Sequence, residues 1–362
     1  MEHIPVLKDH IVELFSPVDG TFIDATVGAG GHALAIAKAL QNSKPQTPRP
    51  PSTWHVGQVN SKQNQSLKLN ISNLNLASNL GFRTSSLQLI GLDRDSAALA
   101  LANENLKTKM SKLGMDYNTI VTLVRGNFRD IKSILGELKI EKVNGILADL
   151  GMSSMQLDDP TRGFSFRHEA PLDMRMSTNS KIQDTNIKQI QNSKLKIKNS
   201  DLTAELIIKT WDEHKIADIL WQYGEERFSR KIARAIKEHR RDISSTTDLA
   251  KLCEKCVPPR FRKHGVHPAT KTFQALRITV NDEVDALKDF LRDAPDLLAP
   301  GGRLAVISFH SLEDRLVKQQ FNELASNGGY EKITKKPIIA TDDAIALNPR
   351  SRSAKLRCIK RV

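Results

Sequence analysis

Cysteine, long apolar runs and an N-terminal signal are scarce or missing in this chain of 362 residues. Three cysteines cannot build a disulfide framework, which indicates a reducing compartment. Because no 18 consecutive residues are apolar, we expect no membrane-spanning helix. The N-terminal MEHIPVLKDHIVELF opens with an acid and lacks the basic and apolar regions of a signal peptide. These absences predict a cytoplasmic protein with no membrane partner.

Acidic residues are also under-represented. Lys and Arg number 54 against 41 Asp and Glu, which leaves a net charge of +13. Such an excess favours a polyanionic partner, because each cation near a phosphate releases condensed counterions. A lysine-rich surface facing solvent would explain the same charge, and the charge alone does not decide between the two.

Two tracts lack the composition of a folded core. Residues 41–86 contain no Asp or Glu, carry five basic residues and are rich in Asn, Gln, Ser and Pro. Such a segment buries too little apolar area to offset its ordering entropy. We interpret it as a surface insertion that interrupts the fold without altering it. Residues 177–200 are a second low-complexity tract, rich in Lys and Asn.

Outside these tracts, apolar strands alternate with helices through the first 152 residues. This alternation predicts a doubly wound α/β fold with a parallel sheet and a ligand at the carboxyl ends of its strands. The expected strands are residues 21–27, 87–95, 119–128 and 143–154, and the expected helices are 32–40 and 96–110.

The remaining chain is first helical in period and then returns to the α/β pattern. The pattern predicts a helix over 273–298, a strand over 303–309, a helix with a capping box from Ser311 to Asp314, and an edge strand over 354–362. We therefore predict one α/β domain, residues 1–152 and 273–362. A helical substrate-recognition domain, residues 153–272, is inserted into it.

The stretch DATVGAGGH, residues 24–32, places a glycine-rich turn after the first strand. A dinucleotide site needs a third glycine that is absent here. Asp93 ends the second strand, Phe128 follows the third and Asp149 ends the fourth. These residues suit the ribose, the adenine and the reacting group of S-adenosylmethionine, which has no pyrophosphate for a helix N-terminus to bind. Without 41–86, Gly31 and Asp93 are about 16 residues apart, near the ~20 expected for a ribose-binding acid.

Several motifs resemble, in order, those of the bacterial small-subunit (16S) ribosomal RNA cytosine-N4 methyltransferases. They cover nearly everything outside the two tracts, and DLGMSSMQLDDPTRGFSF and ISFHSLEDR are highly specific. The others are EHIPVLKDHIVELF, TVGAGGH, LDRD, YGEERFSRKIARAI, HPATKTFQALRITVNDE and NPRSRSAKLR.

This resemblance implies a class I, Rossmann-like methyltransferase dependent on S-adenosylmethionine. It implies methylation of the exocyclic amine of a cytidine in the decoding centre, on ribosomal RNA or the assembled small subunit. By motif, the residues in contact with the cofactor are Gly30, Gly31, His32, Asp93, Phe128, Asp149 and Gln156.

The amino nitrogen of cytosine is a poor nucleophile because its lone pair is delocalised into the ring. Catalysis therefore needs an acceptor for the N–H groups and close alignment. Asp149 is the best-placed acceptor, although it could bind only the cofactor. The Pro-Pro-aromatic signature of DNA amino-methylases is missing, so Phe164 and Phe166 are candidates for stacking on the base, or are core anchors. For His310 we favour a positioning role.

Basic residues recur at helical spacing in RFSRKIARAIKEHRR. This stripe predicts an RNA-contacting face, with a solvated helix face as the alternative. Its members are Arg227, Arg230, Lys231 and Arg234, and a second candidate track is Arg350, Arg352, Lys355 and Arg357.

A metal site is not expected. Cys253 and Cys256 precede His264 and His267 at spacings that do not fit a zinc finger, and two buried thiols on a helix explain the pair better. The sequence leaves a homodimer undecided. A DNA amino-methylase, a nicotinamide oxidoreductase and an inactive binding module are the alternative functions.

Overall fold

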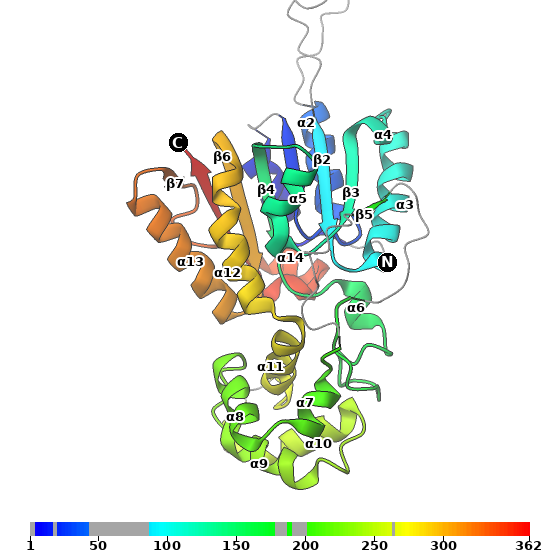
Figure 1. The fold of residues 1–362 in the computed structure, drawn as a ribbon, viewed down its shortest axis with the longest axis vertical. Coiled ribbons are helices and arrows are strands. Elements are labelled where there is room, and N and C mark those ends of the chain that lie inside the picture. The colour runs from blue at the N-terminus through cyan, green and yellow to red at the C-terminus, as the bar shows by residue number, and fades with distance from the viewer. Residues whose placement is uncertain (1–3, 17–19, 43–86, 178–186, 190–200, 263–264) are drawn as a thin grey trace, which may run out of the picture.

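The computed structural model describes residues 4–16, 20–42, 87–177, 187–189, 201–262 and 265–362 (Figure 1). Most of the two low-complexity tracts therefore lies outside the described residues. A nine-stranded sheet with its helices forms one part of the molecule. Helices α7 to α11 form a second part, which lies beyond the ends of the sheet's strands (Figure 1). Among the described residues, no helix has the length and apolar character needed to cross a membrane.

The sheet has the order β5-β3-β2-β1-β4-β6-β9-β7, with β8 also paired to β9. The first six strands in this order run parallel, whereas β9 is antiparallel to β6, β7 and β8. The doubly wound α/β prediction is confirmed. The strands are β1 Thr21–Asp24, β2 Gln88–Asp93, β3 Val121–Arg125, β4 Val143–Asp149, β5 Ile187–Gln189, β6 Leu298–Ser308, β7 Tyr330–Lys332, β8 Ile338–Ile339 and β9 Lys355–Arg361.

Two apolar clusters cover the two faces of the sheet. One contains side chains of α1 (Lys8–Phe15), α2 (Gly31–Asn42) and α3 (Ser96–Lys112). The other contains side chains of α5 (Ile131–Glu137), α12 (Glu283–Asp293) and α13 (Ser311–Ser326). The shorter elements of this part are α4 Tyr117–Ile120, α14 Asp342–Leu347 and the 3₁₀ turns η1 Phe128–Asp130, η3 Pro295–Leu297 and η4 Pro349–Ser353.

A third apolar cluster belongs to the helical part and draws on residues from Phe164 to Val280. Its helices bury one face each because apolar residues recur every three or four positions along them. The elements are α6 Ser154–Asp158, α7 Ala204–Thr210, α8 Glu213–Gln222, α9 Ser229–His239, α10 Thr246–Cys256, η2 Pro259–Phe261 and α11 Thr270–Asn281.

Three local predictions are wrong. The helix expected over 273–298 is two helices, because Asp282 adopts a left-handed conformation with φ 53° and separates α11 from α12. The capping box of α13 joins His310 to Glu313 rather than Ser311 to Asp314. The last strand, β9, is not an edge strand, because β7 and β8 pair with its outer side.

The tracts differ from their predicted extents in two places. Helix α2 continues to Asn42, so its last two residues fall inside the stretch 41–86. Within 177–200, Ile187–Gln189 pairs parallel to β3 as the short strand β5.

Candidate active site

The direction of winding changes between β1 and β4. From β1 the chain moves outward to β2 and β3, and then returns to place β4 on the other side of β1. Ligands of open α/β sheets bind at such a switch point, outside the carboxyl ends of the strands. Asp24, Asp93 and Asp149 end β1, β2 and β4, so three acidic side chains meet at this edge.

The glycine turn after β1 is held by Asp93. The carboxylate of Asp93 accepts hydrogen bonds from the backbone N–H of Gly28 at 3.1 Å and of Asp95 at 2.9 Å. Gly28 and Gly30 have φ values of 50° and 82°, and a Cβ on Gly31 would lie 2.5 Å from Pro5 Cγ. Glycine is therefore required here by conformation or by close approach. A carboxylate has about four acceptor positions, so Asp93 keeps room for ribose hydroxyls.

Two of the carboxylates contain an oxygen without a partner. Oδ2 of Asp24 and Oδ1 of Asp149 are fully covered and make no hydrogen bond within the described part of the chain. Burial raises the pKa of Asp24 and of Asp93 to about 6. Burial, together with the negative charge of Glu313, raises the pKa of Asp149 to about 7.

Orphaned buried acceptors are costly unless a ligand pairs with them. A cationic ligand with N–H donors satisfies both requirements, because it supplies hydrogen bonds and favours the ionised carboxylates. The site therefore fits the sulfonium and ammonium of S-adenosylmethionine.

His32 is buried and faces protein atoms on both sides of its ring. Its Nε2 donates to the carbonyl oxygen of Val6 at 2.8 Å, so in the neutral ring Nδ1 carries no proton. Nδ1 lies 3.7 Å from Asp149 Oδ2, and burial lowers the pKa of His32. The structure thus places His32 between the N-terminal segment and Asp149, with its unprotonated Nδ1 facing the carboxyl group.

Phe128 lies beyond β3, which ends at Arg125, and packs edge-on against Phe290 of α12 with ring centroids 5.5 Å apart. Arg129 fixes the same turn by binding Asp282 at 2.7 Å and Asp289 at 2.6 Å. The orientation of Phe128 therefore depends on α12, an element far away in the sequence.

Gln156 is fully engaged with the protein. Its Nε2 donates to Asp95 Oδ2 at 3.0 Å and to the Met176 carbonyl at 3.1 Å, and its Oε1 accepts from Ser153 N. Arg162 also binds Asp95, at 2.9 Å. Gln156 therefore fastens the loop after β4 to the start of α3. Asp95, the second acid of LDRD, and Arg162 are not among the site residues predicted from the sequence.

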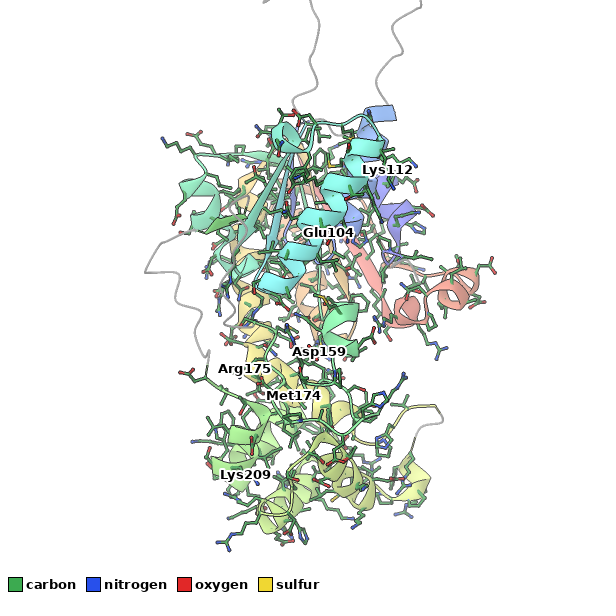
Figure 2. The ribbon with its side chains drawn as sticks, turned by 90° about the vertical axis from the view of Figure 1, so that its right-hand side faces the viewer. Glu104, Lys112, Asp159, Met174, Arg175 and Lys209 are labelled. Atoms are coloured by element: carbon green, nitrogen blue, oxygen red, sulfur yellow. The ribbon has the colours of Figure 1, made fainter. Side chains whose placement is uncertain are left out.

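Asn281, at the end of α11, holds the same loop from below. It donates to the Met174 carbonyl at 2.7 Å and accepts from Met176 N at 2.8 Å. Figure 2 shows Met174, Arg175 and Asp159 between the sheet and the helical part. The cofactor edge and the helical part thus share one set of side-chain contacts.

A cleft of about 2010 Å³ runs along this junction. Its walls include the loop after β4, α11, the start of α13 and η4. Phe164 is 6% exposed and belongs to the helical core. Phe166 is half-buried, lies 4.6 Å from the ring of His267, and is the better candidate for stacking on a base.

Charged side chains from α11, α12 and α13 gather at one wall of the cleft. Arg277 donates to both oxygens of Glu283, at 2.9 and 2.8 Å. His310 Nε2 lies 3.1 Å from Glu313 Oε1. Burial would raise the pKa of Glu313, but His310 and Arg277 outweigh it and lower this pKa. Carboxylate and imidazole atoms of Glu283, His310 and Glu313 come within 4.8 Å of one another, and Arg277 supplies the positive charge beside them.

The predicted basic stripe is exposed but starts before its helix, because α9 begins at Ser229 and Arg227 precedes it. Arg234 lies 3.6 Å from Glu213. The cleft-lining residues come from other elements of the described chain.

The four residues of the alternative track form two pairs in different surroundings. Arg350 and Arg352 line the cleft, and Arg350 pairs with Asp158 at 2.7 Å. Lys355 and Arg357 instead bind Asp314, at 3.1 and 2.7 Å, and Arg357 is buried. These two side chains stabilise the contact of β9 with α13.

The two cysteines of CEKC are buried in α10 as part of the helical core. Burial raises the pKa of Cys253 to about 12, so this thiol stays protonated at neutral pH. His264 lies outside the described residues, and His267 packs on Phe166.

Comparison with known proteins agrees with this geometry. The profile of the MraW methylase family matches residues 77–362. The protein named ribosomal RNA small subunit methyltransferase H from Heliobacterium mobile is 39% identical, over 99% of this chain and 99% of its own length. The protein of the same name from Trichormus variabilis is 40% identical, over 98% of this chain and 90% of its own length. The chain belongs to the MraW methylase family and is a methyltransferase that uses S-adenosylmethionine.

Proposed function

We propose that this methyltransferase modifies the N4 amine of a cytidine in the decoding centre of small-subunit ribosomal RNA. The observation that carries the proposal is Asp149, whose covered Oδ1 has no partner within the described chain. It ends β4 at the switch point, directly before the loop that lines the cleft. The relatives' names support small-subunit ribosomal RNA as the substrate.

The cofactor supplies an electrophilic methyl group. Asp149 accepts an N–H of the cytosine amine, which lets the nitrogen pyramidalise and aim its lone pair at the methyl carbon. Once the cofactor had donated its methyl group, the amine nitrogen would carry a positive charge, and Asp149 or water would take its proton. The positive charge of the bound cofactor favours the ionised form of Asp149, which is the form that accepts the proton.

Other residues bind and orient. Asp93 accepts the ribose hydroxyls, Phe128 packs against adenine, and Gly30 and Gly31 let the chain pass close to the cofactor. His32 lies beside Asp149 at the cofactor edge, and Phe166 stacks on the cytosine. Gln156 acts through the loop it fastens rather than by direct contact.

We further propose that residues 1–152 and 273–362 bind the cofactor and that 153–272 recognise the RNA. The separate apolar cluster of the helical part supports this division, although it extends past residue 272 to Val280. The substrate, as naked RNA or assembled subunit, would place the enzyme in the cytoplasm.

Mass spectrometry of nucleosides from small-subunit ribosomal RNA tests the proposal. Cells that lack the protein should lose N4-methylcytidine at one position. Wild-type protein should restore it, and Asp149→Ala should not. Asp218→Asn, a change to an exposed acid on α8, should restore it as the matched control. Unchanged N4-methylcytidine without the protein would refute the proposal.

A further inference from the structure

Two arginines from separate segments lie over one aromatic ring in the helical part. The guanidinium carbon of Arg227 is 4.7 Å from the ring centroid of Phe261, and that of Arg260 is 5.0 Å from it. Phe261 ends η2, is 38% exposed, and packs on Phe228 with ring centroids 5.3 Å apart. Both guanidinium groups are exposed. A fixed ring thus holds two cations at the surface.

Among the described residues, neither of these two cations is paired with an acid. Within the described chain neither Arg227 nor Arg260 forms an ion pair, whereas Arg262 binds Glu254 at 3.1 Å. Both lie about 5 Å from one centroid, so the two charges are within about 10 Å of each other. Like charges this close repel each other, while the ring attracts both of them. An anion bound between the two guanidinium groups would remove the repulsion between them.

We propose that Arg227, Arg260 and Phe261 form a phosphate clamp for the backbone of the substrate RNA. Guanidinium groups bind phosphate through two parallel hydrogen bonds, and orientation by the ring reduces the entropy lost on binding. The chemistry fits one phosphate or two successive ones. This inference rests on the proposed function for its choice of polyanion.

The position of the clamp favours RNA over an acidic protein. Phe228 directly precedes α9, so the clamp is continuous with the exposed cations Arg230 and Lys231. On the other side, η2 leads to α11, whose Phe273 and Arg277 line the cleft. A strand whose target base enters the cleft would therefore have flanking phosphates within the basic surface. Acidic protein surfaces offer carboxylates on flexible side chains, whereas phosphates recur along RNA at regular intervals.

The test is the double variant R227Q/R260Q, with K288Q/R292Q as a control that removes the same charge from α12, where both cations bind acids. Binding of an RNA fragment that contains the decoding centre is measured by fluorescence anisotropy between 50 and 300 mM KCl. The slope of log K against log salt should fall by about 0.7 in the double variant if the clamp binds one phosphate and by about 1.4 if it binds two, since each single-strand phosphate contact contributes about 0.7. The KM for RNA should rise roughly tenfold, with the affinity for S-adenosylmethionine unchanged.

F261L keeps both arginines and removes the ring. It should raise the KM for RNA by a smaller factor, and F261Y should restore the parent value. An unchanged salt slope in folded R227Q/R260Q overturns the clamp. Lost binding to whole subunits with normal binding to RNA also overturns it and assigns the surface to a protein. The salt slope measures RNA binding and not methylation. The clamp proposal can therefore be refuted while N4-methylcytidine in cells still depends on the protein, which would leave the proposed function intact.

Discussion

Cofactor affinity should depend steeply on pH, because the carboxylates at the switch point are protonated over part of the neutral range. In the free protein the pKa of Asp149 is about 7, and those of Asp24 and Asp93 are about 6. A bound cation favours the ionised forms, so binding releases protons and is favoured as the pH rises through these values. Burial lowers the pKa of His32, which favours its neutral form.

The size of the effect follows from the ionised fractions. At pH 6 about one tenth of Asp149 is ionised, against about three quarters at pH 7.5, which weakens the affinity about eightfold, or about 1.2 kcal/mol. If Asp24 and Asp93 must also ionise, each contributes a further factor of about two at pH 6. The expected loss of affinity from pH 7.5 to pH 6 is therefore about eightfold to thirtyfold.

Isothermal titration calorimetry between pH 5.5 and 7.5 measures this change in cofactor affinity. Over this pH range the amino group of the cofactor stays largely protonated. Two buffers with different ionisation enthalpies give the number of protons released. Asp149→Asn should bind more weakly at pH 7.5 and should show a flatter pH profile. A dissociation constant that is independent of pH, or that falls on acidification, would refute the reasoning.

Asp93→Ala should weaken cofactor binding by about 1–3 kcal/mol, because it removes ribose acceptors and releases Gly28 N–H; equal affinities by calorimetry would refute the ribose role. Replacing all four residues of the basic stripe (Arg227, Arg230, Lys231 and Arg234) by Gln should raise the KM for RNA and flatten the salt dependence of RNA binding without altering cofactor affinity. A salt slope equal to that of the parent protein would show that the stripe is only a solvated helix face. A chelator should leave the melting temperature unchanged, since Cys253 and Cys256 are core side chains; a lower Tm would indicate a bound metal.

The parts of the fold that the sequence predicts well have local signals. β2 and β4 are apolar and end in an acid, so their order in the chain was enough to predict that Asp93 and Asp149 lie at one edge. Helices such as α3 and α13 show a clear period. The turn after β1 is recognisable in the sequence because it contains three glycines within four residues.

The remaining features depend on partners far apart in the chain. Nothing near Asp149 in the sequence indicates that Glu313 approaches it, or that His32 is tied to Val6. β7 and β8 are too short to show a period, and this is why β9 looked like an edge. The bonds of Asn281 to the Met174 and Met176 backbone are equally invisible, because an Asn at the end of a helix has many roles.

The pairing of β4 with β6 constrains the order of folding. Gly145 to Asp149 pair with Arg303 to Ile307, so the apolar edge of β4 has no partner until the whole intervening helical part has been synthesised. The helical core draws on one continuous stretch, Phe164 to Val280, and its contacts are comparatively local. Local contacts form faster than distant ones, and domains tend to fold as they leave the ribosome. The helical part should therefore fold first, while β1 to β4 wait as an incomplete sheet with an exposed edge. During that interval the nascent chain needs protection from aggregation, and closure of the sheet by β6 and β9 ends it.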